Sequence, residues 1–523
     1  MKAKFIFTAV VIFMAILLLS VFSATEARAA GEVKAPDEAK LKAILAEFEQ
    51  YAAKGMADWR VPGMVVAIVR DDEVIFEKAF GVKELGKADP VTVNTLFQIG
   101  STSKAFTSAL VATLVDEGKV KWDDRVTDHL SDFMMYDPWV TREFMVSDLM
   151  AQHSGMIEHA TDGTVMMGFD RQHIIDSIKY VKPATSFRSA FAYQNNLWLV
   201  AAKLVEKHTG KSWEENIKER IFKPLGMTSS SCDMNSYVTA ADVATLHRIV
   251  DDKIVILPMD WPHHFWAYTY APAGGINSNI KDVEKWARMQ AANGLFEGRQ
   301  VIKEENVKFM HTPQTITPIG PPMHSYCLGW IYREASPYPI IWHNGGTSGS
   351  KTMIALVPQA KLEVIVLSNL IATQLPESLA FKFIDMYFGN PEHDWSKEEL
   401  EKAKKALEKA KAEKPKKPDS PTPAMPLDKY AGDYANDVYG TVTVSKKGDG
   451  LTLTIGPKKV EINLSHWDRD AFMAKWDYYV EPEELGFVTF RPGPDGKVID
   501  LVMDVFNEDG CGIFRKVMPS SQK

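Results

Sequence analysis

One short stretch constrains this chain more than any other, because it joins a strand to a helix around a serine. Residues 97–106 read Phe-Gln-Ile-Gly-Ser-Thr-Ser-Lys-Ala-Phe. A glycine ends an apolar, strand-like run, and good helix formers then continue to Glu117. Residues three apart on a helix share a face, so Ser101 and Lys104 point the same way. The stretch therefore predicts a hydroxyl and an amine side by side at a helix N-terminus.

This pair of side chains suits nucleophilic catalysis. A serine hydroxyl is a weak nucleophile that needs an adjacent base. Lys104 can be that base if its surroundings keep it neutral, and the helix dipole favours negative charge developing at Ser101. The same residues also fit a simpler interpretation, a capping serine beside a solvated lysine. Other elements of the chain have to decide between the two.

Composition narrows the classes of function. The chain has 523 residues, enough for two or three domains, and a net charge of −8. It has no long basic stretch, which argues against a nucleic-acid partner. Cys232, Cys327 and Cys511 show no paired spacing, so they indicate neither a metal site nor a disulfide framework. We expect no metal and no organic cofactor.

The N-terminus predicts the compartment. Lys2 and Lys4 precede an apolar run over residues 5–22, and Ala-Arg-Ala follows at 27–29. This order is typical of a secretory signal peptide, here residues 1–29. The mature protein is then exported, to the periplasm or the cell exterior. Because the apolar run is long for a signal, an uncleaved segment that anchors the protein in a membrane is the alternative.

Residues 30–390 show the periodicities of an α+β domain. Helical patterns cover residues 37–59, 196–208, 213–222, 280–293 and 376–387, and strand patterns cover 64–70, 74–80, 329–333, 340–343, 352–357 and 362–368. The strands lie at both ends of the region. The pattern therefore predicts an antiparallel sheet flanked by helices, with a helical insertion between its two halves.

The composition changes after this domain. Residues 396–411 are rich in Glu, Lys and Ala, which predicts a solvated spacer helix. Residues 414–426 contain five prolines, typical of an extended linker, so we assign 391–426 to a charged helix and linker. From 427 to 523 the strand patterns are short, at residues 440–444, 451–455, 460–464, 487–491, 498–505 and 511–516. Such spacing fits a small antiparallel barrel or sandwich, and we predict the β-barrel.

A second candidate element is Tyr193-Gln-Asn195, just before a predicted helix. Nearby positive charge lowers the pKa of a phenol, so Tyr193 could lose or relay a proton. The Asn195 amide could bond a substrate carbonyl and orient Lys104. Taken alone, the pair also fits a half-buried tyrosine beside a helix-capping asparagine.

A third candidate element is Trp-His-Asn-Gly-Gly-Thr at residues 342–347, after an apolar run. Gly345 and Gly346 would let a substrate backbone lie close to the strand. A free N–H there could pair with that of Ser101 as an oxyanion hole. His343 would face the same cleft and polarise the proton path, although a structural histidine and a simple glycine turn are the alternative.

In order and spacing these elements resemble the motifs of the β-lactamase-related serine hydrolases. That family includes class C β-lactamases, penicillin-binding D-Ala-D-Ala carboxypeptidases, D-aminopeptidases and family VIII esterases. The matching motifs are Ser101-x-x-Lys104, Tyr193-x-Asn195 and His343-x-Gly345. The resemblance runs from about residue 39 to 388 and includes His-Ser-Gly at 153–155, Pro-Leu-Gly-Met at 224–227 and Ala-Gly-Gly at 273–275.

The resemblance implies a role for each residue. Ser101 is acylated, and Lys104 acts with Tyr193 as the base. Tyr193 then returns the proton to the leaving group. Asn195 binds the substrate carbonyl, and the N–H groups of Ser101 and Gly346 form the oxyanion hole. No second carboxylate base is evident for deacylation, so either Tyr193 or His343 must activate the water.

One departure from the family pattern bears on the substrate. His343 stands where true β-lactamases have a lysine, and a neutral imidazole attracts a substrate carboxylate less strongly. We therefore predict a serine hydrolase that cleaves a small ester or peptide bond in a small-molecule or short-peptide substrate. The alternatives are a penicillin-binding protein, whether peptidoglycan-directed carboxypeptidase, β-lactamase or slow-turnover sensor, and a scaffold that has lost its chemistry.

The C-terminal block, residues 427–523, resembles the lipocalin-like domain appended to some archaeal and bacterial relatives. Tyr-Ala-Gly-Asp-Tyr at 430–434 resembles its opening motif. In such relatives the domain can pack near the active-site mouth and limit substrate size. A role in stability or in forming a homo-oligomer has similar weight. We expect the protein to be bound to a membrane only if the N-terminal apolar segment is not cleaved.

Overall fold

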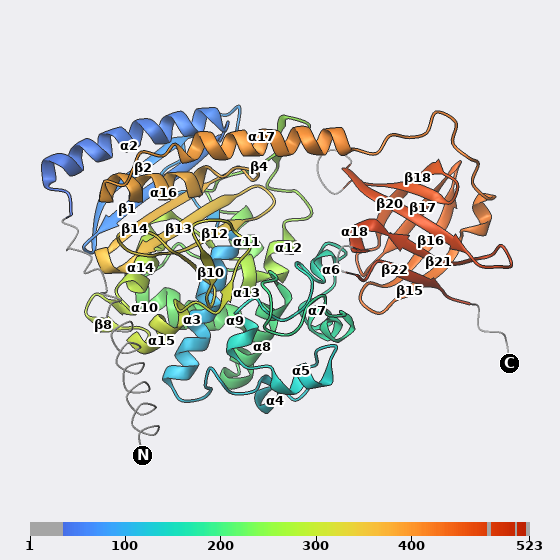
Figure 1. Ribbon diagram of the computed structural model, residues 1–523, viewed down its shortest axis with the longest axis horizontal. Helices are drawn as coiled ribbons and strands as arrows, with labels where there is room; N and C mark the ends of the chain where they lie inside the picture. The colour runs from blue at the N-terminus through green and yellow to red at the C-terminus, as the bar shows by residue number, and fades with distance from the viewer. Residues whose placement is uncertain (1–34, 478–482, 508–509, 519–523) are drawn as a thin grey trace, which may run out of the picture.

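The computed structural model describes residues 35–477, 483–507 and 510–518. The predicted signal peptide, residues 1–29, lies outside these ranges. Figure 1 shows a large sheet with helices on both faces and a separate barrel beside it. Within the described ranges, no helix combines the length and the apolar character needed to cross a bilayer.

The large sheet is antiparallel and has eight strands, in the order β2-β1-β14-β13-β12-β11-β10-β9. β1 pairs with β14, so the sheet is built from both ends of the domain, as predicted. The strands are β1 (Gly63–Arg70), β2 (Glu73–Gly81), β9 (Thr315–Ile316), β10 (His324–Tyr326), β11 (Ile331–Arg333), β12 (Ile340–Gly346), β13 (Lys351–Val357) and β14 (Leu362–Ser368). The two short strands β9 and β10 have no periodicity of their own and were not expected.

Helices cover both faces of this sheet. α2 (Glu38–Asp58) and α16 (Leu375–Phe388) cover one face, where the ring of Phe48 lies 5.1 Å from that of Phe383. α14 (Ile280–Ala291) covers the other face. Trp286 of α14 stacks on Phe106 with ring centroids 3.8 Å apart. Phe106 belongs to α3 (Ser103–Asp116), so the sheet and the helix that follows Ser101 share one core.

The chain between β2 and β9 is the predicted helical insertion. Three short strand pairs lie in it: β3 (Phe97–Gln98) with β6 (Asn277–Ser278), β4 (Leu246–Val250) with β5 (Lys253–Leu257), and β7 (Leu295–Phe296) with β8 (Arg299–Gln300). Its other helices are α4 (Val126–His129), α5 (Pro138–Glu143), α6 (Asp162–Met166), α7 (Arg171–Ser177), α8 (Asn196–Thr209), α9 (Trp213–Ile217), α10 (Lys223–Leu225), α11 (Met234–Val238), α12 (Phe265–Thr269), α13 (Ala271–Gly274) and α15 (Glu304–Met310).

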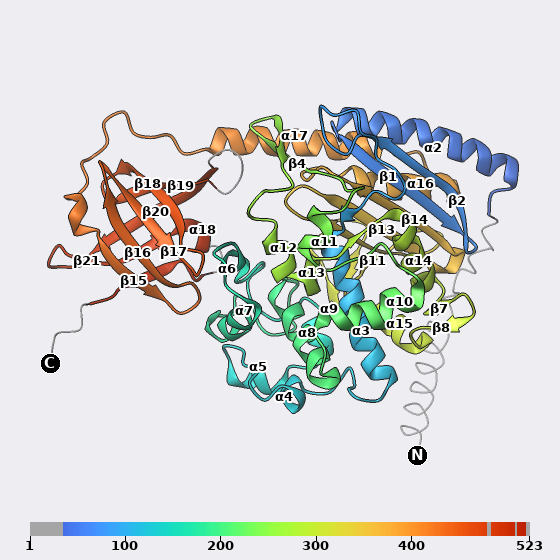
Figure 2. The ribbon, with the colours of Figure 1, turned by 180° about the vertical axis from the view of Figure 1, so that it is seen from behind.

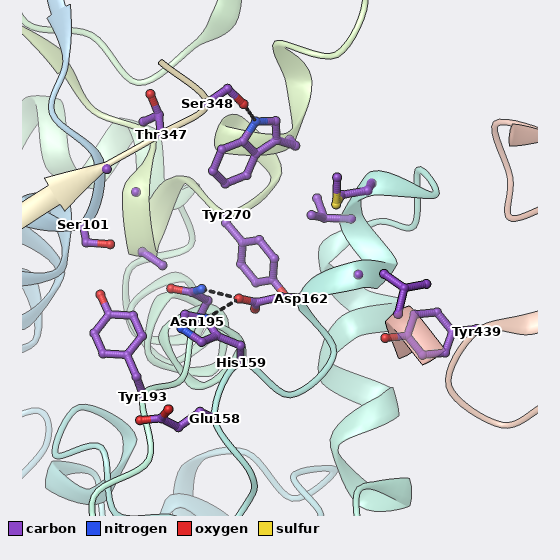
Figure 3. A pocket seen from close by; sticks show the side chains of 18 residues that line it. Ser101, Glu158, His159, Asp162, Tyr193, Asn195, Tyr270, Thr347, Ser348 and Tyr439 are labelled. Carbon is purple, nitrogen blue, oxygen red and sulfur yellow. Dashed lines mark hydrogen bonds and ion pairs between the residues drawn. The ribbon is translucent and has the colours of Figure 1, made fainter. Parts of the chain in front are cut away.

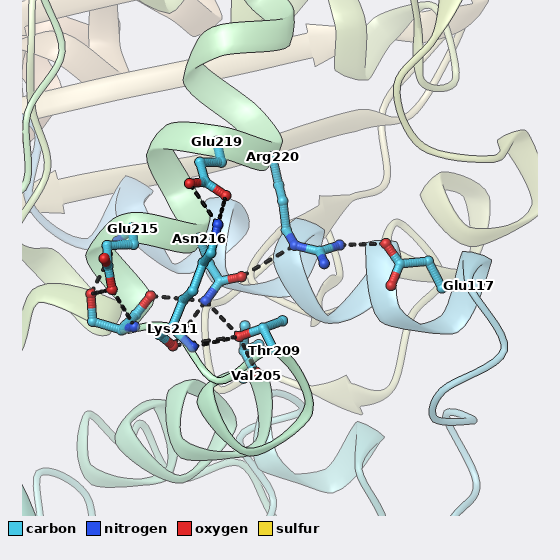
Figure 4. Close-up of polar contacts among 9 residues, drawn as sticks. Glu117, Val205, Thr209, Lys211, Glu215, Asn216, Glu219 and Arg220 are labelled. Carbon is cyan, nitrogen blue, oxygen red and sulfur yellow. Dashed lines mark hydrogen bonds and ion pairs between the residues drawn. The ribbon is translucent and has the colours of Figure 1, made fainter.

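A polar network anchors the far end of α3 (Figure 4). The Asn216 amide donates to the hydroxyl of Thr209, at 2.9 Å, and to two carbonyl oxygens of the turn between α8 and α9. Arg220 donates to the Asn216 side chain at 3.2 Å and to Glu117 at 2.6 Å. Because Glu117 is the C-cap residue of α3, this network ties α3 to α8 and α9.

The spacer helix and linker lead to the barrel. The predicted helix is α17 (Trp395–Glu413), which is mostly exposed and runs from the sheet toward the barrel (Figures 1 and 2). Its first turn is docked rather than solvated, because Trp59 donates to the buried Ser396 hydroxyl at 3.1 Å. The linker is extended, and Thr422 exchanges hydrogen bonds with Asp468 and Arg469 of the barrel.

The C-terminal part is a closed antiparallel barrel, as predicted. It has eight strands where the sequence indicates six: β15 (Gly432–Asn436), β16 (Gly440–Lys447), β17 (Gly450–Ile455), β18 (Val460–Asp468), β19 (Ala471–Trp476), β20 (Glu483–Pro492), β21 (Val498–Met503) and β22 (Ile513–Lys516). β15 and β19 were missed, since neither is rich in β-branched residues. A short helix, α18 (Asp504–Asn507), follows β21 and lies beside α6 in Figure 2.

Candidate active site

The turn that carries Ser101 lies directly against the end of β12. Gly100–Thr102 form a 3₁₀ turn before α3, and Gly100 adopts a left-handed φ of +55°. A methyl group on Gly100 would lie 2.5 Å from the Gly346 nitrogen, and one on Gly345 would lie 1.9 Å from the Ile99 carbonyl oxygen. The two backbones can approach this closely only because glycine has no Cβ. Two motifs far apart in the sequence therefore meet at Ser101.

This close approach makes Gly345→Ala a disruptive substitution. The added methyl meets backbone atoms that have no side-chain rotation to relieve the clash, so we expect a loss of about 1–3 kcal/mol or more in the free energy of unfolding. Thermal unfolding of the two proteins measures this. Gly320→Ala is the matched control, because a methyl there meets nothing within 4 Å. Equal unfolding midpoints for the two variants would contradict the backbone contact.

Lys104 is fully buried, and its amine has three neighbours. The Nζ atom lies 3.2 Å from Ser101 Oγ, 2.7 Å from Asn195 Oδ1 and 3.0 Å from the Ala273 carbonyl oxygen. Two of these neighbours are carbonyl oxygens that can only accept hydrogen bonds. A neutral amine therefore donates its two N–H groups to them and directs its lone pair at the Ser101 hydroxyl.

The surroundings of Lys104 favour this neutral form. Burial lowers its pKa to about 7, because taking an ammonium group out of water disfavours the charged state. The carboxylate of Asp162 acts in the opposite direction and raises the pKa. At neutral pH a large share of the molecules therefore holds an unprotonated amine beside the serine.

Tyr193 lies on the other side of Ser101. Its hydroxyl points toward Ser101 in Figure 3, and Lys104 Nζ lies 4.6 Å from the centre of its ring. The expectation that positive charge lowers the pKa of Tyr193 is wrong. Burial raises that pKa well above its ordinary value and outweighs the hydrogen bond with Ser101. Tyr193 is therefore a protonated phenol at neutral pH, able to donate or relay a proton.

Asn195 is held at both ends of its amide. Oδ1 accepts from Lys104 at 2.7 Å, and Nδ2 donates to Asp162 Oδ2 at 2.7 Å. The same Asp162 oxygen lies 2.8 Å from His159 Nδ1, and this contact raises the pKa of His159. Figure 3 shows Asp162 between Asn195, His159 and the Tyr270 ring. The arrangement fixes the Asn195 amide toward Lys104.

His343 lies behind the reacting groups. It is buried, and its ring centre lies 6.5 Å from that of Tyr193. Its Nδ1–H donates to the Asn344 carbonyl oxygen at 2.5 Å, so Nε2 accepts from the Tyr326 hydroxyl at 3.1 Å. Burial, and secondly Lys104, lower its pKa to about 3, which keeps the imidazole neutral.

A cavity of about 510 Å³ opens beside Ser101. Ser101, Tyr193, Asn195 and Gly346 line it, whereas Lys104, His343 and Gly345 are not among the lining residues. Its remaining walls come from four regions: Glu158, His159, Asp162, Gly163, Val165 and Met166 around α6; Trp266, Tyr270, Ala273 and Gly274 of α12 and α13; Thr347 and Ser348 after β12; and Tyr439 and Val505 of the barrel.

Sequence reasoning missed the acidic and aromatic part of this site. Asp162, His159 and Tyr270 belong to no motif that we identified, although Asp162 follows the His-Ser-Gly match within ten residues. The resemblance implied that the barrel can pack near the active-site mouth, and Tyr439 and Val505 of the C-terminal part do line the cavity, but no motif singled out Tyr439. In the described part of the chain, no group of three or more His, Cys, Asp and Glu side chains is placed to hold a metal ion.

Two protein families match this chain. The Beta-lactamase family matches residues 48–378, and a domain of unknown function, DUF3471, matches residues 416–511. An unguisins hydrolase from Aspergillus campestris is 28% identical over 480 residues, which cover 86% of this chain and 87% of that protein.

Two solved structures share the fold. The octameric penicillin-binding protein homologue from Pyrococcus abyssi aligns with a TM-score of 0.60 and 22% identity, over 88% of this chain and 98% of that one. A D-stereospecific amidohydrolase from Streptomyces sp. aligns with a TM-score of 0.52 and 18% identity, over 62% of this chain and 94% of that one.

Proposed function

Because this chain belongs to the β-lactamase family of serine hydrolases, we propose that Ser101 is its nucleophile and Lys104 the general base. The observation that carries the proposal is the buried Lys104 amine, 3.2 Å from Ser101 Oγ and with a pKa lowered to about 7. A base is most effective when its pKa lies near the working pH. A solvated lysine would be protonated at that pH and could not accept the serine proton.

The acylation step follows from the hydrogen-bond partners. Ser101 Oγ forms a bond to the substrate carbonyl carbon, and its proton moves to Lys104 Nζ. The N–H groups of Ser101 and Gly346 stabilise the negative charge that develops on the carbonyl oxygen. As the bond to the leaving group breaks, the leaving group takes a proton from Tyr193, which recovers one from Lys104.

Deacylation uses the same groups in reverse. Water attacks the acyl carbon and loses its proton through Tyr193 to Lys104, and Ser101 leaves as the restored hydroxyl. Asn195 keeps Lys104 oriented through both steps, because its Nδ2 is held by Asp162. His343 supports the site through Tyr326 rather than by touching the substrate.

The substrate we propose is a small ester or the amide of a short peptide. The cavity volume of about 510 Å³ suits a ligand of a few residues, and Trp266, Tyr270 and Tyr439 offer apolar walls. The relatives described as an unguisins hydrolase and a D-stereospecific amidohydrolase support an amide, and the second supports a D-configured acyl group. The neutral His343 offers no charge to a substrate carboxylate.

We further propose that the protein is exported, because residues 1–29 have the order of a signal peptide. The intact mass of protein secreted from an expressing cell would then correspond to a chain that begins at Ala30. A full-length mass in the membrane fraction would indicate an uncleaved anchor instead.

A substrate panel tests the proposed activity. We expect turnover of p-nitrophenyl esters of short acids and of D-amino-acid amides, with nitrocefin hydrolysed at least about 100-fold less efficiently, as expected where a charged carboxylate partner is missing. A fluorescent penicillin distinguishes the alternative. A persistent labelled band that Ser101→Ala removes, without turnover of the panel, would indicate a slow penicillin sensor and overturn the hydrolase proposal.

A further inference from the structure

Asp162 links the catalytic pair to a strained loop. It begins α6 and follows Thr161, a β-branched residue with a left-handed φ of +66°, and His159 has a φ of +58°. Such conformations are costly for non-glycine residues and persist only where surrounding contacts enforce them. Here the Asn196 side chain donates to the Ala160 carbonyl oxygen at 3.0 Å, and the His159 N–H donates to the Tyr193 carbonyl oxygen at 2.8 Å.

These contacts bind the loop to the segment that carries Tyr193 and Asn195. The strained backbone has a clear result, since it aims the Asp162 carboxylate at Asn195 Nδ2, 2.7 Å away. Asp162 is the first residue of α6, one position after the N-cap Thr161, and its carboxylate bonds Asn195 and His159. The geometry of the loop therefore serves Asn195 rather than α6 itself.

The opposite side of α6 packs against the barrel. A methyl group on Gly163, the next residue, would lie 2.9 Å from Phe506 and 3.0 Å from the Tyr439 hydroxyl. Phe506 and Tyr439 are buried and stack with ring centres 4.1 Å apart. Beyond α6, the Lys458 N–H donates to the Met167 carbonyl oxygen at 3.3 Å.

A second contact closes the same interface. His173 of α7 donates from Nε2 to the Val438 carbonyl oxygen at 2.7 Å, and Lys458 Nζ lies 3.2 Å from the centre of the Phe265 ring. The barrel thus contacts the helical region through α6, α7 and α12 (Figure 2). Residues of α6 and α12 also line the cavity. Displacing the barrel would move α6, and with it Asp162.

We infer that Asp162 is a positioning residue for the Lys104–Asn195 pair and that the C-terminal barrel, packed on α6, holds it in place. The inference rests on the proposed function, since it concerns the same base. It gives the barrel a part in catalysis besides lining the cavity. By holding α6, the barrel fixes how close the negative charge of Asp162 lies to Asn195 and Lys104.

The charge of Asp162 shifts the pKa of Lys104 in a direction that can be measured. The titratable groups that face Lys104 are Asp162 and His159 from the α6 region, Tyr193 before α8, and His343 on β12. Asp162 is the one among them that raises the pKa of Lys104, because its negative charge favours the ammonium form. Removing that charge should therefore move the deprotonation of Lys104 to lower pH.

The first experiment measures kcat/KM against pH for Asp162→Asn and Asp162→Ala. The Asp162→Asn variant keeps an acceptor for Asn195, so we expect kcat within about tenfold of the parent and an acid limb lowered by about half a pH unit or more. Asp162→Ala loses the acceptor and should lose about 10–100-fold in kcat. The same downward shift in a His159→Gln background assigns the limb to Lys104 rather than to the imidazole.

The matched control is Asp176→Asn, which removes an exposed carboxylate from neighbouring α7. The acid limb of its kcat/KM profile should lie at the same pH as in the parent enzyme. A limb that stays in place for Asp162→Asn as well, or equal kcat for the Asp162→Asn and Asp162→Ala variants, would overturn the role of Asp162.

The second experiment tests the barrel. Gly163→Ala adds a methyl group that a helix tolerates but that Phe506 does not, so kcat should fall by about tenfold or more through displacement of Asp162. Phe506→Leu shortens the opposing side chain and should restore most of the lost rate in the double variant. An unchanged kcat for Gly163→Ala, or a loss that Phe506→Leu leaves uncorrected, would overturn the coupling.

These outcomes separate the two proposals. If Ser101→Ala keeps its activity, the proposed function itself fails. If Ser101→Ala is inactive but the Asp162 and Gly163 variants behave like the parent enzyme, only the positioning role is lost.

Discussion

Replacing Ser101 with alanine is expected to lower kcat on a p-nitrophenyl ester by about 10⁴–10⁶-fold, because no acyl-enzyme can then form. The residual rate would come from the oxyanion site and binding alone. Ser101 Oγ lies 3.2 Å from Lys104 Nζ, and Lys104 keeps its two carbonyl partners without the hydroxyl. The fold should therefore survive the substitution, and the thermal unfolding midpoint should stay close to that of the parent.

The measurement combines kinetics with intact mass. The parent enzyme, quenched during turnover of a slow ester, should gain the mass of one acyl group, and Ser101→Ala should gain none. Ser189→Ala is the control, because Ser189 is exposed, its hydroxyl donates to the Ser186 carbonyl oxygen, and it is not among the residues that line the cavity. A kcat of the Ser101→Ala enzyme within about tenfold of the parent value would contradict the acyl-enzyme mechanism.

Substitutions of Lys104 should lower kcat nearly as much as Ser101→Ala does. Lys104→Arg keeps a positive charge that cannot be removed in a protein, so it supplies no base. Lys104→Met removes the amine and preserves most of the volume in this fully buried site. We expect both to lose about 10³-fold or more in kcat, because the nucleophile and its base act as a unit. Circular dichroism and thermal unfolding establish that the methionine variant is folded.

The pH profile identifies the base independently of the rate loss. The neutral amine is the active form, so kcat/KM should fall about tenfold per pH unit below the Lys104 pKa of about 7 and level off above it. Burial raises the pKa of Tyr193, which therefore produces no acid limb in this range. The residual activity of Lys104→Met should lack the limb. A limb at the same pH in that variant would assign the titration to another group.

Local patterns predicted much of the architecture. α2 and α8 lie where helical spacing of apolar residues placed them. β13 and β14 lie where short, continuous apolar runs predicted strands, and both are buried on the two faces of the sheet. Short strands such as β9 carry too few residues to show a period. β19 has the mixed composition Ala-Phe-Met-Ala-Lys-Trp and forms only through its barrel neighbours.

By itself, the sequence determined the pairing of Ser101 with Lys104, since that spacing is a property of one helical turn. It also determined the order of the motifs and the change of composition before the barrel. Only the tertiary structure decided that Asp162 holds Asn195, that Tyr439 borders the cavity, and that burial raises the pKa of Tyr193. Those features depend on which distant segments exclude water from a side chain, and no local pattern of residues encodes that.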